Sequence, residues 1–174
     1  LGCKFDLIYP TAPEDYVVLF VANCVCGGVA AAGGGVSSDA QYNTVAGTNA
    51  GDSFTGTNAT ENTLFGYNSG TAITTGDGNT VIGYQAGDAL TTASMTTLVG
   101  RTAGGKITTG ARTVAVGDGA LQNVTTTDWN VAVGMNAGYS CTGSNNTLMG
   151  DHAGWQISSG SNNVLIGRNT STLT

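Results

Sequence analysis

Charge is scarce in this chain. Charged residues make up 9% of its 174 residues, and 5 Lys and Arg stand against 11 Asp and Glu, for a formal net charge of −6. With so few cations the sequence offers no basic patch for phosphate groups, so we expect no nucleic-acid partner. We interpret the mild acidity as a solubility feature of an exposed surface.

Residue types that carry chemistry are also sparse. The single His, His152, is expected to be a solvated side chain in a surface turn. A catalytic triad or a pair of facing carboxylates needs partners that converge on a cleft, and no such cluster is evident. We therefore predict that the chain is not an enzyme and has no cofactor. Calcium between neighbouring coils is the one alternative, although the calcium-binding nonapeptide pattern is missing. The scattered acids are Asp52, Asp77, Asp88, Asp118, Asp128 and Asp151.

Cysteines are few and do not form a metal motif. Three of the 4, namely Cys3, Cys24 and Cys26, fall near the N-terminus, and the fourth is Cys141. The Cys24–Cys26 spacing is too tight for a zinc knuckle, and no second pair follows it. Two interpretations stay open: small buried residues, or chain-to-chain disulfides of the first three in an oxidising setting.

One long apolar run, residues 17–35, precedes the rest of the chain. It has no basic flank, follows Pro13-Glu14-Asp15 and is broken by Gly27-Gly28, so we predict no membrane span. We expect an extended strand over residues 16–25 and then a Gly/Ala connector. Residues 1–42 would form an attachment or assembly segment. Its candidate assembly strand contains Tyr16, Val17, Val18, Leu19, Phe20 and Val21.

Glycine is abundant, with 28 residues, and it marks a tandem repeat. A Gly follows an apolar pair once in each unit, at steps of 16 to 19 residues, which is the signature of a repeat array. These glycines are Gly47, Gly66, Gly83, Gly100, Gly117, Gly134, Gly150 and Gly167.

The residues around each Gly keep the same character. In the clearest unit Val81 and Ile82 precede Gly83, a small Ala86 follows after three residues and an apolar Leu90 after seven. We predict a short strand, a tight turn at Gly, a second short strand and a polar turn. The fold class is all-β: a β-solenoid (β-roll) of about eight coils of 16–19 residues over residues 43–174. At ~4.8 Å per coil the rod would be roughly 38 Å long, with ladders of stacked Asn and Thr.

The paired apolar positions predict an oligomer. Adjacent residues of a strand point to opposite faces, so one of each pair fills the coil and the other leaves an apolar stripe outside. A coil of about 17 residues also encloses a thin core. We therefore predict that several chains, most simply three, pack their stripes around a common axis. The residues of this solenoid and oligomer core are Val81, Ile82, Leu98, Val99, Val116, Val133, Leu148, Met149, Leu165 and Ile166.

The unit TTGDGNTVIGYQAG, residues 74–87, resembles repeats of phage tail fibres and related viral or bacterial surface fibres. It is also similar to the head repeats of trimeric autotransporter adhesins. The resemblance covers about residues 43–174 and weakens at residues 112–121, where Leu121 replaces the second Gly. It implies a homotrimeric β-roll that serves as a fibre or decoration protein on a virion or cell surface. The location would be extracellular, with a capsid or tail as partner.

Three further hypotheses follow from the residues. The N-terminal strand could add to the open sheet edge of a neighbouring subunit and give a head-to-tail filament. A surface adhesin could contact glycans through Tyr84, Trp129 and Trp155. An ice-binding solenoid could use a strip of stacked Thr pairs. These pairs are Thr74-Thr75, Thr91-Thr92, Thr108-Thr109 and Thr125-Thr126.

Overall fold

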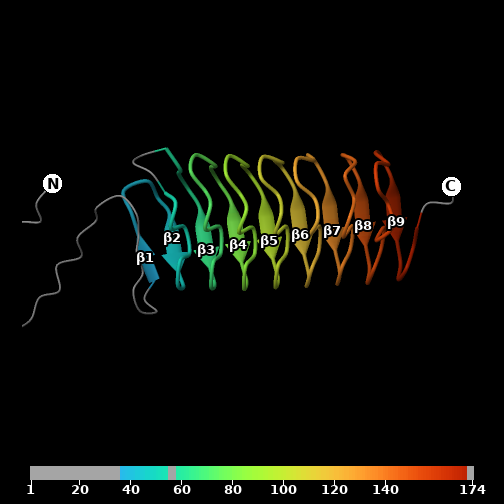
Figure 1. Cartoon of the computed structure of the whole chain (residues 1–174), viewed down its shortest axis with the longest axis horizontal. Helices are drawn as coiled ribbons and strands as arrows, with labels where there is room; N and C mark the ends of the chain where they lie inside the picture. Colours follow the sequence, from blue (N-terminus) through green and yellow to red (C-terminus); the bar gives the residue numbers. More distant parts are fainter. Residues whose placement is uncertain (1–35, 55–57, 172–174) are drawn as a thin grey trace, which may run out of the picture.

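The chain folds into a rod of stacked coils (Figure 1). The computed structural model describes residues 36–54 and 58–171, and these contain strands and turns but no α-helix. Each coil contributes one three-residue strand to a 9-stranded sheet, and all strand pairs are parallel except β1 with β2. The predicted all-β solenoid is confirmed. The strands are β1 Val36–Ser38, β2 Thr44–Ala46, β3 Thr63–Phe65, β4 Thr80–Ile82, β5 Thr97–Val99, β6 Val114–Val116, β7 Val131–Val133, β8 Thr147–Met149 and β9 Val164–Ile166.

Alternation along each strand separates the core from the surface. The middle residue of every strand from β2 to β8 is fully buried, and the residues on either side of it point outward. Val81, Leu98 and Leu148 are therefore core residues, as predicted. Leu165 of β9 is half-buried, because no further coil covers it within the described chain.

The predicted second strand of each unit is wrong. Ile73 and Leu90 each lie between a turn and a bend and not in a strand, although both side chains are buried. The backbone N–H of Ile73 donates to the carbonyl of Gly70 within its own coil, at 3.2 Å, and Leu90 does the same to Gly87. A left-handed residue at Gly70 or Gly87 bends the chain. The stretch after it still bonds to the next coil, for example from the N–H of Thr74 to the carbonyl of Thr91 at 3.0 Å, but it does not form a regular strand.

A hairpin begins the sheet. β1 pairs antiparallel with β2, with Val36 opposite Ala46. The carboxylate of Asp39 closes the turn, because it accepts hydrogen bonds from the backbone N–H groups of Gln41, at 3.0 Å, and Asn43, at 2.9 Å. Residues 36–42, which the sequence groups with the N-terminal segment, thus continue the sheet. β1 covers one edge of the sheet, whereas the outer edge of β9 has no partner strand among the described residues.

The glycine after each strand allows the coils to stack closely. Gly83 has φ +138°, and a Cβ atom on it would lie 2.3 Å from the carbonyl oxygen of Gly100 in the next coil. No side chain fits that space without moving the backbone. This contact is the physical reason for the Gly that defines the repeat.

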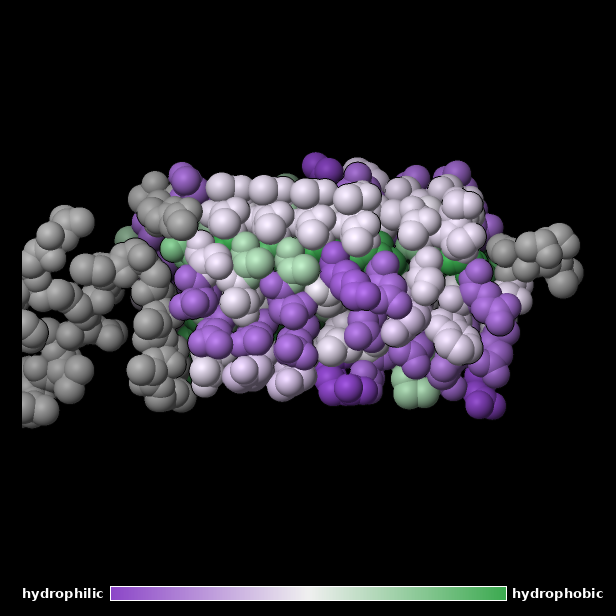
Figure 2. Space-filling view, viewed as in Figure 1, coloured by the Kyte–Doolittle hydropathy of each residue, from purple (hydrophilic) through white to green (hydrophobic). Residues whose placement is uncertain are grey.

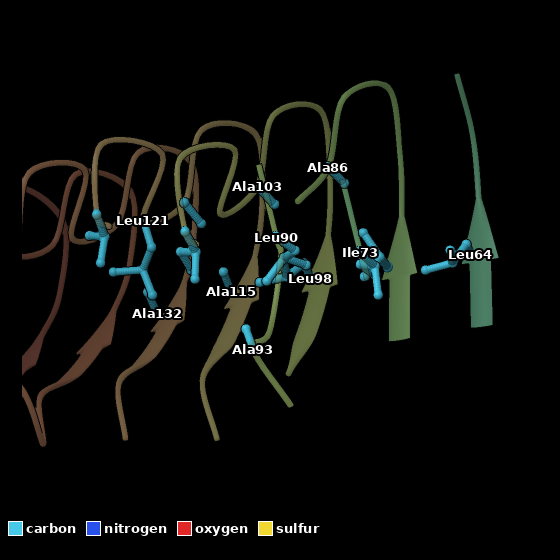
Figure 3. Close-up of a cluster of buried hydrophobic side chains, with 14 of the residues drawn as sticks. Leu64, Ile73, Ala86, Leu90, Ala93, Leu98, Ala103, Ala115, Leu121 and Ala132 are labelled. Atoms are coloured by element: carbon cyan, nitrogen blue, oxygen red, sulfur yellow. The ribbon is translucent and has the colours of Figure 1, made fainter. Parts of the chain in front are cut away.

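A second glycine stands four residues after the first in most coils, because core side chains leave no room there for a Cβ atom. A Cβ on Gly104 would lie 2.8 Å from a methyl group of Leu98, in the strand of its own coil. Leu121 occupies the same place one coil later and is fully buried, although its φ is +51°. The nearest strand centres there are Ala115 and Ala132, so the larger side chain fills the space that they leave (Figure 3).

Candidate interaction surface

The outward face of the sheet is weakly polar and carries no charge in the strands. Its two rows come from the first and third residues of strands β2 to β9: the first are Thr or Val, and the third are apolar. In the third row Ile82 is 39% exposed, Met149 41% and Ile166 67%. We call this third row the outer stripe. Its members are Ala46, Phe65, Ile82, Val99, Val116, Val133, Met149 and Ile166.

The side chains one residue after each Gly border the outer stripe, and several of them pair between neighbouring coils. The rings of Tyr67 and Tyr84 stack with centroids 5.3 Å apart. In the following coils the guanidinium of Arg101 lies 2.8 Å from the carboxylate of Asp118. Sequence reasoning singled out Tyr84 as an exposed aromatic but missed these pairs. Their spacing of 17 residues was the available signal, because it places side chains above one another in a solenoid.

The Thr pairs form two different rows. In the first three pairs the first hydroxyl donates to a backbone carbonyl of the next coil, for example from Thr74 to Thr91 at 3.2 Å and from Thr91 to Thr108 at 3.1 Å. The second member, such as Thr75 or Thr92, is exposed. Rows of weakly polar side chains run along the rod in Figure 2, while strongly hydrophobic residues on that side show as a narrow band between rows.

The last coils carry a cluster of charged groups. The carboxylate of Asp151 contacts Nδ1 of His152 and, at 3.0 Å, Nε of Arg168. The hydrogen bond from Arg168, and then that from His152, holds the pKa of Asp151 below its usual range. Nε2 of His152 lies 3.4 Å from Nδ2 of Asn136 in the preceding coil. The expectation of a freely solvated His152 is wrong, because Asp151 of its own coil and Asn136 of the preceding coil hold the imidazole on both nitrogens.

The three candidate contact aromatics are all exposed, with Tyr84 at 51%, Trp129 at 54% and Trp155 at 45%. The structure does not bring them together. Trp129 lies under the guanidinium of Arg112, at 4.9 Å from the ring centroid. Trp155 stands edge-to-face against Tyr139, with centroids 6.5 Å apart, and against His152, at 5.1 Å.

A shallow hollow of about 260 Å³ opens beside Trp155. Its lining comes from the turn that contains Trp155 and from the turn after β9. Six residues line it: His152, Trp155, Gln156, Asn169, Thr170 and Ser171.

The remaining predictions concern the cysteines, the assembly strand, metal binding and a membrane span. Cys141 is buried and unpaired, and burial raises the pKa of its thiol. Cys3, Cys24, Cys26 and the assembly strand of residues 16–21 lie outside the described residues. Within residues 36–54 and 58–171, no three His, Cys, Asp or Glu side chains are grouped so that they could hold a metal ion. The same ranges contain no helix that is long and apolar enough to cross a membrane.

No known protein family, curated protein or solved structure matches this chain.

Proposed function

We propose that the chain is the shaft of a structural fibre, or a decoration protein, on the outside of a virion or cell. Three copies would pack their outer stripes around a common axis that runs along the rods. The observation that carries the proposal is the outer stripe itself, an apolar row that continues over eight consecutive coils. Contiguous apolar surface of this kind is typical of an interface.

The regular register supports identical partners. Equivalent residues in neighbouring strands lie directly opposite each other, for instance Val81 opposite Leu98 in β4 and β5. Copies related by rotation about an axis parallel to the rod would place the same residue of each chain at the same level. Val99 would meet Val99, and Val116 would meet Val116. The strand positions on this face bring no charge into the interface, so packing it requires no charge desolvation.

Closure around an axis supports three copies. The outer stripe is one residue wide on each chain. Three such stripes that meet at one axis would bury one another completely and leave no apolar row exposed. The polar border that begins at Arg101 and Asp118 would then lie at the rim, where an ion pair keeps its water. The resemblance to trimeric β-rolls supports the same number.

The mass of the assembly in solution tests this proposal. Sedimentation equilibrium should give three times the 17.3 kDa chain mass. Val99→Asp and Val116→Asp each place a carboxylate in the outer stripe and should give monomers. Thr92→Asp, an exposed position on another side of a neighbouring coil, is the matched control and should stay trimeric. A wild-type monomer at about 100 µM, far above the Kd expected of a stable interface, would overturn the proposal; a dimer would overturn the three-fold arrangement.

Filament formation is a second part of the proposal. β1 covers the N-terminal edge of the sheet, so the edge of β9 is the unpaired one in the described part of the chain. The segment of residues 16–21 from the next subunit would add to it, since exposed edges accept strands. Removing residues 1–35 keeps β1 and should leave short rods in electron micrographs. Filaments of unchanged length would contradict this role.

Ice binding is a second candidate function, favoured by the Thr rows. The fixed hydroxyls of Thr74, Thr91 and Thr108 repeat once per coil, which gives a regular array beside the exposed row. Thermal hysteresis measured by nanolitre osmometry tests it. The wild type should show a freezing gap that Thr92→Asp abolishes and Val99→Asp retains; no gap in the wild type would exclude this function.

A further inference from the structure

We propose that the C-terminal end of the rod carries a binding site for one neutral sugar ring of a larger glycan, with Trp155 as its stacking platform. The site goes beyond the shaft function, because its platform, Trp155, lies in the turn after β8 and not on the outward sheet face; only the supporting pair Asp151 and Arg168 reaches the border of the outer stripe.

Trp155 is held in place yet accessible. Tyr139 meets its ring at 74° and His152 at 83°, both edge-to-face. Two such neighbours restrict rotation of the indole, and 45% of the residue remains exposed. An immobilised aromatic ring can contact the apolar C–H face of a pyranose without a further loss of side-chain entropy.

His152 acts as a positioning residue in this site. The Asp151 carboxylate faces Nδ1 and the Asn136 amide faces Nε2, so hydrogen bonds on two sides fix the plane of the imidazole. That plane in turn supports Trp155. Arg168 completes the network by pairing with the second oxygen of Asp151, at 3.0 Å. Arg168 is thus paired with Asp151 and is not left as a free cation for an acidic sugar, which favours a neutral sugar over an anionic one.

The hollow supplies the polar contacts that a sugar needs. The amide groups of Gln156 and Asn169 both donate and accept, and Ser171 adds a hydroxyl. Its volume of about 260 Å³ is just below the range of drug-sized pockets and suits one ring rather than an oligosaccharide. An apolar platform with a few convergent polar groups is the general form of a small-ligand site.

The site does not recur along the rod. The residues in the place of Trp155 in the other coils are Asp52, Thr71, Asp88, Gly105, Gln122 and Tyr139. Only the last two complete coils therefore carry a ring there, and the hollow lies beside the second of these rings.

Intrinsic fluorescence provides the test. The chain has 2 Trp residues, so Trp129→Phe leaves Trp155 as the only indole in the full-length protein. This variant is titrated with the methyl glycosides of glucose, galactose, mannose and N-acetylglucosamine, with methyl glucuronide as the anionic comparison. We expect saturable quenching or a spectral shift with at least one neutral glycoside, and a matching saturation-transfer NMR signal from its ring protons.

Substitutions then assign the signal to the site. In the wild-type background Trp155→Ala should weaken the saturation-transfer affinity at least about tenfold, the size of a lost ring contact. Trp155→Phe should retain part of it, and Trp129→Ala, the matched control, should retain all of it. Circular dichroism and the assembly mass show whether Trp155→Ala is still folded. No response to any neutral glycoside at about 50 mM, well above a typical weak Kd, would overturn the proposal, as would tighter binding of the glucuronide or full binding by Trp155→Ala.

Discussion

Asn79 donates two hydrogen bonds to a single oxygen atom of Asn62, from its backbone N–H at 3.0 Å and from Nδ2 at 2.9 Å. Both residues are fully buried. The oxygen of Asn79 then accepts from the N–H and the hydroxyl of Thr96 in the next coil, at 3.0 and 2.9 Å. Asn146 repeats the arrangement on Asn130. Such ladders satisfy backbone groups that lie inside the rod next to the strands.

Asn79→Ala should break this ladder. It leaves the carbonyl of Ala93 without its donor and the N–H and hydroxyl of Thr96 without their acceptor, all inside the rod. We expect a loss of about 3 kcal/mol in the free energy of unfolding, measured by urea denaturation. Thr108→Ala removes an exposed hydrogen bond, from its hydroxyl to the carbonyl of Thr125 at 3.1 Å, and should cost less than about 0.5 kcal/mol. Equal losses in the two variants would contradict the role of the buried ladder.

Two glycines of one coil should respond very differently to alanine. Gly83→Ala places a methyl group 2.3 Å from the carbonyl oxygen of Gly100 and should cost more than about 3 kcal/mol. Gly78→Ala is the matched control, since φ is +65° but nothing lies within 4 Å of the added atom. Its cost should be about 1 kcal/mol, the penalty of the left-handed conformation alone. Thermal unfolding by circular dichroism measures both, and a mild effect at Gly83 would show that the coils can move apart.

Leu121→Gly restores the common residue of the repeat but should destabilise the protein. It removes a fully buried side chain, and relief of the left-handed conformation only partly offsets the cavity. The net loss should be about 2 to 3 kcal/mol. Ala115→Leu alone should also destabilise, by overpacking against Leu121.

The two changes together should compensate each other. In other coils a strand Leu lies over the Gly of this turn, as Leu98 lies over Gly104. The double variant should therefore recover about 1 to 2 kcal/mol relative to the sum of the single variants in a denaturation cycle. Strict additivity would show that Leu121 and Ala115 do not share a space.

Asp88→Asn should stabilise the fold at neutral pH. Partial burial raises the pKa of Asp88, although the backbone N–H groups of Asp88 and Ala89 act in the opposite direction. A raised folded-state pKa means that the ionised form destabilises the fold above that pKa, and that this penalty disappears as the pH falls through it. The melting temperature of the variant should exceed that of the wild type at pH 7, and the difference should shrink toward acid pH. A difference that grows in acid would contradict the burial effect.

Sequence reasoning recovered much of the architecture because the repeat forces it. The position of Gly83 after Val81 and Ile82 correctly predicted parallel coils, with one of the two apolar residues inside and the other outside. It failed at Ile73 and Leu90, where buried apolar residues were taken for strands. Burial shows only that a side chain points inward, and the left-handed glycines before these residues bend the backbone instead.

The candidate sites also differ in how far the sequence predicted them. The outer stripe was predictable, because strand alternation alone places Ile82 and Val99 on the surface. The His152 network was predictable only in part: coil spacing places Asn136 beside His152 and Arg168 beside Asp151, but it does not show that Asp151 bonds both His152 and Arg168.

By itself, then, the sequence determined the period, the stacking direction and the apolar face, since all three depend on local patterns that recur in every coil. Only the tertiary structure decided how individual coils depart from that pattern. Leu121 fits because Ala115 and Ala132 leave room for it, β1 turns back because Asp39 holds the hairpin, and Trp155 is fixed because His152 and Tyr139 meet it. The Leu121 and Trp155 cases depend on side chains that the repeat brings together across coils, and the Asp39 turn depends on a local bond outside the repeat, so the repeat pattern specifies none of them.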